Sequence, residues 1–176
     1  MKKYLTNNSD SISKFLDIAR KKKVKKIIFT STEHVYGDTF NKLQDAERTE
    51  VFPKNYYGFS KLLAEKMLYT FYNKYRINID ILRIPRVIAL NQSSFLHKMV
   101  KSAINKNKIL IKNNNTKFNF IYIEDLISAM NQCLKKKSTG FRILNIFNNS
   151  KPENLKMLAF KIKKEISKKV KIHFFK

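Results

Sequence analysis

Residues 26–38 read KIIFTSTEHVYGD and form the most informative stretch of the sequence. Its apolar run predicts a buried strand over residues 24–31. Thr32 then places a hydroxyl at the end of that strand. A loop follows, and apolar side chains at helical spacing predict a helix over residues 56–75. We therefore interpret the stretch as the strand and loop of an α/β unit whose helix comes next.

Helices and strands alternate along the rest of the chain, which favours a parallel sheet. Further helices are predicted over residues 8–20, 94–104 and 125–134, and a last amphipathic helix is predicted to open at Pro152. Further strands are predicted over residues 77–84, 108–111, 118–123, 142–147 and 170–175.

The composition favours one packed domain. The chain has 176 residues, of which 43% are hydrophobic and 12% aromatic. No apolar run approaches the roughly 20 residues of a membrane span. The N-terminus turns polar at once, so no signal peptide is expected. The single cysteine, Cys133, argues against a disulfide framework and fits a reducing compartment. We therefore expect a cytoplasmic protein without a membrane span.

The chain is strongly basic, with a formal net charge of +24. Such a charge favours nucleic acid or another anionic surface as a partner. Lysines, asparagines and isoleucines are nevertheless abundant all along the chain, as an AT-rich coding sequence would produce. No aromatic-rich RNA-binding motif or zinc-finger spacing accompanies the basic runs. Nucleic-acid binding is therefore kept only as an alternative.

Tyr57 and Lys61 are four residues apart at a helix start, so they share one face. A tyrosine with a pKa of about 10 is a poor base at neutral pH. Lowering that pKa by about three units requires about 4 kcal/mol of preferential stabilisation of the phenolate. One cation at ~4 Å supplies roughly this energy at an effective dielectric constant near 20. Lys61 is the candidate cation, and Thr32 is a candidate hydrogen-bond donor to the same substrate oxygen. This combination suits hydride transfer at a carbinol.

Several segments, in this order, resemble the extended short-chain dehydrogenase/reductases of the nucleotide-sugar epimerase/dehydratase family. The resemblance covers nearly the whole chain, and the segments taken together are specific to this family. It rests on residues 26–32, 35–38, 55–66 (NYYGFSKLLAEK), 81–85 (ILRIP) and 120–126 (FIYIEDL).

The resemblance implies a site. Tyr57 is the implied acid/base, Lys61 lowers its pKa and holds the cofactor ribose, and Thr32 orients the substrate hydroxyl. The implied cofactor is NAD or NADP, bound by Asn7, Ser31, Tyr57, Lys61 and Ile84. The implied substrate is a nucleotide sugar, contacted by Glu33, His34, Tyr36 and Arg86.

Other side chains are interpreted as structural. The three histidines, His34, His97 and His173, lack ligand spacing, so no metal site is expected. Cys133 lies on the apolar face of its helix and is expected in the core. Asp125 is expected to cap its helix. For Tyr36, a packed aromatic side chain stays open beside a place in the substrate pocket.

The resemblance also implies the architecture. It is a partial Rossmann-type parallel sheet with helices on both faces, plus a small C-terminal α+β substrate part. Residues 1–90 are then the C-terminal half of a dinucleotide-binding domain, and residues 91–176 are the substrate part, interleaved with it. The chain has only three glycines, which lie too far apart for a glycine-rich cofactor loop. We therefore expect an N-terminally truncated chain that pairs with a missing N-terminal half or forms a homodimer through the Tyr57 helix.

Departures from the family pattern leave the reaction open. Glu33 and His34 stand where dehydratases of this branch carry Asp-Glu, which disfavours a dehydratase. Arg86 stands in place of a substrate-binding asparagine, and Phe118 in place of an arginine that pairs with the nucleotide diphosphate. A 4-epimerase or a 4-keto reductase leads, with a role in polysaccharide or activated-sugar synthesis. The alternatives are a non-catalytic remnant or sugar-nucleotide-binding module, and a basic nucleic-acid-binding protein.

Overall fold

A computed structural model describes residues 11–37, 45–89, 94–112, 117–137, 139–147 and 153–175. Its centre is a parallel sheet with the strand order β1-β2-β7. The three strands are β1 (Lys26–Thr32), β2 (Asn78–Ile84) and β7 (Phe141–Asn145). Strand β7 comes from the second half of the sequence, so segments far apart in the chain share one sheet.

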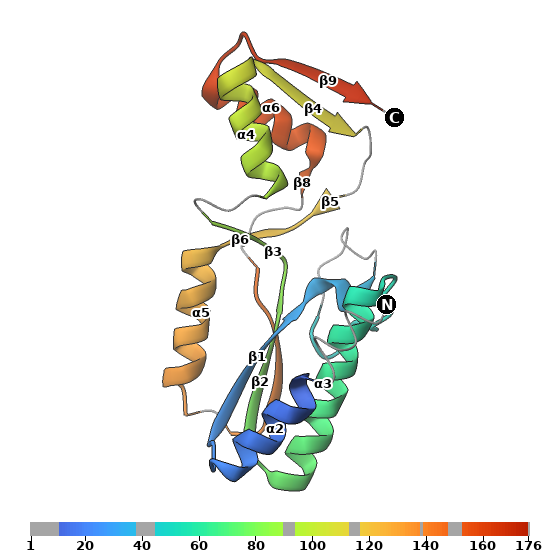
Figure 1. Cartoon of the computed structure of the whole chain (residues 1–176), viewed down its shortest axis with the longest axis vertical. Coiled ribbons are helices and arrows are strands. Elements are labelled where there is room, and N and C mark those ends of the chain that lie inside the picture. The colour runs from blue at the N-terminus through green and yellow to red at the C-terminus, as the bar shows by residue number, and fades with distance from the viewer. Residues whose placement is uncertain are drawn as a thin grey trace.

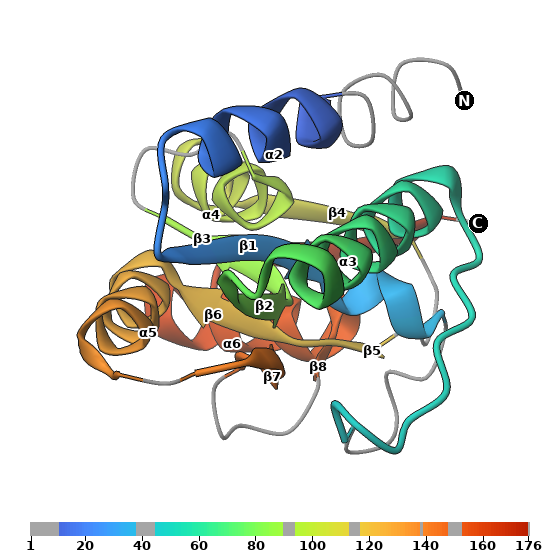
Figure 2. The same cartoon turned by 90° about the horizontal axis from the view of Figure 1, so that it is seen from below.

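Helices cover both faces of this sheet (Figures 1 and 2). Helices α2 (Ser11–Lys21) and α3 (Tyr56–Tyr75) lie on one face, and α5 (Ile123–Lys135) lies on the other. The helix predicted over residues 56–75 is confirmed, and the predicted partial Rossmann-type parallel sheet with helices on both faces is confirmed as well. Asn55 explains where α3 begins, because its side chain accepts a hydrogen bond from the Gly58 N–H at 2.8 Å.

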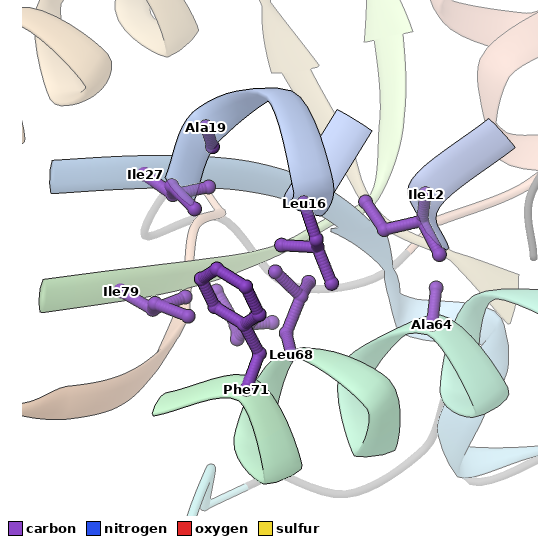
Figure 3. Packing of buried hydrophobic residues seen from close by; sticks show 9 residues of the cluster. Ile12, Leu16, Ala19, Ile27, Ala64, Leu68, Phe71 and Ile79 are labelled. Carbon is purple, nitrogen blue, oxygen red and sulfur yellow. The ribbon is translucent and has the colours of Figure 1, made fainter. Parts of the chain in front are cut away.

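The main core lies between the sheet and the pair α2 and α3 (Figure 3). Each helix contributes a stripe of apolar side chains three or four residues apart, and the strands contribute alternate residues. Burial of each large apolar side chain contributes about 1.5–3 kcal/mol. The buried members are Ile12, Leu16, Ala19, Ile27, Ala64, Leu68, Phe71, Ile79 and Ile81.

A second core joins the helices and strands drawn at the top of Figure 1. Helices α4 (Phe95–Lys106) and α6 (Leu155–Ile166) pack on the parallel strands β4 (Lys108–Lys112) and β9 (Lys171–Phe175). Two short strands were not predicted, because each depends on a partner distant in the sequence. They are β3 (Arg86–Ile88), which pairs with β6 (Phe120–Tyr122), and β8 (Glu153–Asn154), which pairs with β5 (Lys117–Phe118).

Two predictions about helix starts are wrong. Helix α6 begins at Leu155, not at Pro152, because Asn154 caps it by accepting a hydrogen bond from the Met157 N–H at 2.9 Å. Asp125 does not cap α5, since the helix begins at Ile123 and the capping position is Tyr122. Asp125 instead lies in the first turn, where its negative charge is favoured by the helix dipole.

An ionic cluster lies on the α5 side of the central sheet. Asp80 on β2 is 1% exposed and accepts hydrogen bonds from Arg142 on β7 at 2.7 and 2.8 Å. Lys26 on β1 forms an ion pair with Asp80 at 2.8 Å and also donates to the carbonyl of Cys133 in α5. The cluster therefore links all three strands to α5. Cys133 is buried, as predicted.

Among the helices that the structure describes, none has the length and apolarity needed to cross a membrane.

Candidate active site

The carboxyl end of β1 meets the first turn of α3. Strand β1 ends at Thr32, and the short 3-10 helix η2 (Glu33–Tyr36) follows directly. The Thr32 hydroxyl oxygen caps η2 by accepting a hydrogen bond from the His34 N–H at 3.3 Å. Gly58 in the first turn of α3 lies against the carbonyl of His34. The loop that follows β1 is thus held directly against the start of α3.

The Tyr57 and Lys61 side chains lie beside residues on either side of Thr32. The Tyr57 ring meets the His34 imidazole edge to face, with the ring centroids 5.9 Å apart. The Lys61 Nζ donates a hydrogen bond to the Thr30 carbonyl at 2.9 Å and lies 4.9 Å from the centre of the Phe29 ring. The structure therefore brings Tyr57 and Lys61 to the end of β1 that carries Thr32.

Lys61 is a half-buried cation. Burial lowers the pKa of its ammonium group from the ordinary value, and the nearby Glu65 carboxylate opposes this shift. An ammonium group has three N–H donors, so its contact with Thr30 is compatible with further hydrogen bonds. Lys61 can thus contact both the end of β1 and a hydroxylated ligand.

Glu33 places a carboxyl group immediately after Thr32. The residue is 5% exposed, and its Oε2 accepts a hydrogen bond from the Asn119 amide at 3.3 Å. Burial raises the pKa of Glu33 to about 7, although the Asn119 hydrogen bond and the positive charge of Arg86 both lower it. Glu33 can therefore exchange a proton near neutral pH.

Arg86 lines a pocket of about 400 Å³ at the end of β2. Its guanidinium group lies 5.5 Å from the centre of the Phe95 ring, and Phe120 completes an aromatic wall. The Phe95 and Phe120 rings are 6.2 Å apart. A guanidinium group beside aromatic rings can bind phosphate oxygens and a planar group together.

Two predicted contact residues point into the protein instead. The Tyr36 hydroxyl accepts a hydrogen bond from Arg83 at 2.8 Å and donates one to Asn145 at 2.7 Å, and the residue is 2% exposed. Tyr36 is thus a packed aromatic side chain, one of the two interpretations that the sequence left open. The Ser31 hydroxyl donates to the carboxylate of Glu65 within the core.

The remaining predicted residues divide into two cases. Ile84 is the last residue of β2 and is the register partner of Thr32, so it lies at the same end of the sheet. Asn7 lies outside the described residues.

The sequence reasoning missed an ion pair beneath the site. Arg83 Nη2 lies 2.7 Å from Glu65 Oε2, and both side chains are almost completely buried. Two signals were present in the sequence. Glu65 follows Lys61 by one helical turn, and Arg83 interrupts the apolar residues of β2.

The fold and this site define a class of protein, and comparison with known sequences identifies it. The profile of the NAD dependent epimerase/dehydratase family matches residues 1–146. The chain belongs to this family. The comparison therefore confirms the resemblance on which the predicted site rests.

Individual relatives agree with the family assignment. The uncharacterized UDP-glucose epimerase YtcB of Bacillus subtilis is 25% identical over 97% of this chain and 54% of its own length. The dTDP-D-glucose 4,6-dehydratase of Dictyostelium discoideum is 28% identical over 83% of this chain and 36% of its own length. The chain spans about half the length of the curated relatives it matches, or less.

A solved structure shows the same fold. The UDP-glucuronic acid 4-epimerase of Bacillus cereus, in complex with UDP-glucuronic acid and NAD, superimposes with a TM-score of 0.85. It is 25% identical, and the match covers 98% of this chain and 55% of that chain.

Proposed function

We propose that this chain supplies the catalytic centre of an NAD(P)-dependent enzyme that transfers a hydride at a sugar carbinol or ketone of a nucleotide sugar. The leading reactions are 4-epimerisation and 4-keto reduction. One observation carries the proposal. The start of α3 is held on the loop after β1, so Tyr57 and Lys61 lie beside the strand end that carries Thr32.

Each of these three side chains has a role in the proposed reaction. The Tyr57 phenol acts as general acid or base on the reacting sugar oxygen. The Lys61 ammonium stabilises the phenolate, because an opposite charge within ~4–6 Å favours the charged form of an acid. The Thr32 hydroxyl hydrogen-bonds to the same oxygen and orients it.

The residues at this end of the sheet fit the ribose and nicotinamide part of NAD or NADP. The half-buried Lys61 ammonium offers donors to a ribose diol, and Ile84 adds an apolar side chain at the end of β2. A bound nicotinamide supplies the hydride acceptor and donor. Tyr57 moves the proton that accompanies the hydride.

The proposed substrate lies on the Arg86 side of the site. Arg86 and Phe95 offer a cation for the phosphates and an aromatic surface for the base. His34 packs against the Tyr57 ring, and the charge of Arg86 acts on Glu33, so both residues are proposed to contact the sugar. The relatives support a sugar nucleotide, since the similar epimerase structure holds UDP-glucuronic acid and NAD.

A fluorescence titration of the purified chain with NADH and NADPH tests the proposal. We expect saturable binding that Tyr57→Phe and Lys61→Ala weaken. Tyr69→Phe, the same substitution at an exposed position further along α3, is the matched control and should bind as the wild type does. Absence of binding at millimolar cofactor would contradict the proposal.

Dehydration is the second candidate reaction, and Glu33 is the observation that favours it. A buried carboxyl group with a pKa of about 7, directly after Thr32, can protonate a leaving hydroxyl group. Detection by NMR of a 4-keto-6-deoxy sugar that Glu33→Gln no longer forms would establish dehydration as the reaction. A product that keeps the C6 hydroxyl group would exclude it.

We also propose that the chain forms a homodimer through α2 and α3. These helices leave large apolar side chains exposed, among them Phe15, Ile18 and Phe59. Sedimentation of the wild type and of Ile18→Glu at several concentrations tests this.

The comparisons favour neither the non-catalytic remnant nor the nucleic-acid-binding alternative.

A further inference from the structure

Glu65 is the centre of a buried polar network beneath the proposed site. Its carboxylate accepts a hydrogen bond from the Ser31 hydroxyl on β1. It also accepts two from Arg83 on β2, from Nε at 3.2 Å and from Nη2 at 2.7 Å. The exposed fractions are 1% for Ser31, 3% for Glu65 and 5% for Arg83. The network thus joins α3 to both neighbouring strands through almost fully buried side chains.

We propose that Glu65 is a positioning residue for the Tyr57–Lys61 pair, fixing the Lys61 ammonium group against the end of β1. This inference rests on the proposed function. It assigns a role to a residue that itself touches neither cofactor nor substrate.

Tyr57, Lys61 and Glu65 follow one another at intervals of four residues, so they lie along one face of α3. Glu65 holds Ser31, and the neighbouring Thr30 carbonyl accepts the hydrogen bond from Lys61. One carboxylate therefore sets the position of α3 relative to the two backbone positions that precede Thr32.

Burial of Lys61 disfavours its charged form, and Glu65 is the group whose charge opposes this effect. Among the described residues, the other charged or titratable groups around this face are His34, against the Tyr57 ring, and Arg83, paired with Glu65. Glu47 and Lys66 line the pocket beside Glu65 and Arg83. Loss of the Glu65 charge should therefore lower the pKa of the Lys61 ammonium group further.

A buried ion pair is weak evidence for stability, because desolvation offsets much of the attraction between the charges. Such a pair is better evidence for a positioning role where it fixes one arrangement of neighbouring strands and helices. Arg83 extends the network to the Tyr36 hydroxyl, and through it to Asn145 on β7. Strands β1, β2 and β7 and the loop after β1 are thus all held by one polar cluster.

The test follows the titration of Lys61 by NMR of the chain with ¹³C-methylated lysines, with Lys61→Arg identifying the signal. Cofactor and substrate are absent, so the result does not depend on whether the proposed reaction occurs. We expect Glu65→Gln to increase the acid dissociation constant of Lys61 about tenfold, the order expected for loss of one charge at one helical turn. In a separate binding experiment, the NADH affinity of Glu65→Gln should fall at a lower pH than that of the wild type.

Asp80→Asn is the matched control, because it breaks another arginine–carboxylate pair of the same sheet with the same two-bond geometry. It should lower thermal stability without moving the Lys61 titration. If Glu65→Gln does not fold, Glu65→Asp carries the test and should shift the titration partway in the same direction. An unchanged Lys61 titration in the folded Glu65 variant, or an equal shift in Asp80→Asn, would overturn the proposal.

Discussion

Gly58 lies so close to His34 that a Cβ atom at Gly58 would stand 2.6 Å from the His34 carbonyl oxygen. Such a distance is shorter than any ordinary van der Waals contact between these atoms. Gly58 has an ordinary helical backbone that other residues can adopt. Close packing against His34, and not backbone conformation, therefore requires a glycine here. This contact fixes the first turn of α3, and with it Tyr57, against the loop that follows Thr32.

Gly58→Ala should destabilise the chain by about 1–3 kcal/mol, because the added methyl group forces α3 away from η2. Urea denaturation measures the change in the free energy of unfolding. Lys66→Ala, at an exposed position of the same helix, serves as the control and should change it little. A Gly58→Ala chain as stable as the wild type would show that the contact is not tight.

The stability of the chain should depend on the protonation of Glu33. Burial raises its pKa from 4.5 to about 7, so the folded chain binds this proton more tightly than the unfolded chain does. Stability contributed by the protonated group is therefore present below pH 4.5 and is lost as the pH rises through about 7. The loss amounts to about 3 kcal/mol, because a tenfold difference in proton affinity between the folded and unfolded chains corresponds to about 1.4 kcal/mol.

Glu33→Gln should remove this loss and flatten the pH dependence between pH 5 and 8. Denaturant titrations of both chains across this range provide the measurement. Parallel stability curves for the wild type and Glu33→Gln would contradict the assignment.

Features with local signals could be predicted from the sequence. The bounds of α3 follow from the helical spacing of its apolar side chains. Thr32, Tyr57 and Lys61 could be selected because the strand end and the Tyr-x-x-x-Lys spacing are both visible in the sequence. Their proposed roles remain predictions.

Features that depend on tertiary contacts could not be predicted. The pair of Glu65 and Arg83 exists because β1 and β2 align Ser31 with Arg83, a register that no local pattern specifies. The inward direction of the Tyr36 hydroxyl likewise depends on Arg83 and on Asn145 of β7. Strand β3 requires pairing with β6, which is distant in the sequence.

Asp80→Asn should destabilise the chain by about 3 kcal/mol or more at neutral pH, because it leaves Arg142 and Lys26 without their counter-charge. Although burial raises it, the pKa of Asp80 lies below its ordinary value, since Arg142 and Lys26 hydrogen-bond to the carboxylate. A lowered pKa contributes stability that is lost as the pH falls through the folded-state value. The difference between Asp80→Asn and the wild type should therefore shrink in acid. Thermal melts at pH 7 and pH 3 would reveal a constant difference if this account were wrong.

Cys133 should react slowly with iodoacetamide in the native chain. Its side chain is buried, and both burial and the charge of Asp80 raise the pKa of its thiol, so little thiolate is present. Mass spectrometry after brief labelling, with and without urea, measures the difference. Equal labelling in both conditions would place the thiol at an accessible position.

The proposed hydride transfer is tested by conversion of UDP-hexoses and dTDP-hexoses by the purified chain with NAD or NADP, followed by NMR at C4 of the sugar. We expect a change of configuration or oxidation state at C4 for at least one of these sugars. Tyr57→Phe should reduce the rate by at least about a hundredfold, the usual contribution of a general acid or base, and Tyr69→Phe should not. Conversion at an equal rate by Tyr57→Phe, or saturable cofactor binding without conversion of any of these sugars, would contradict the account.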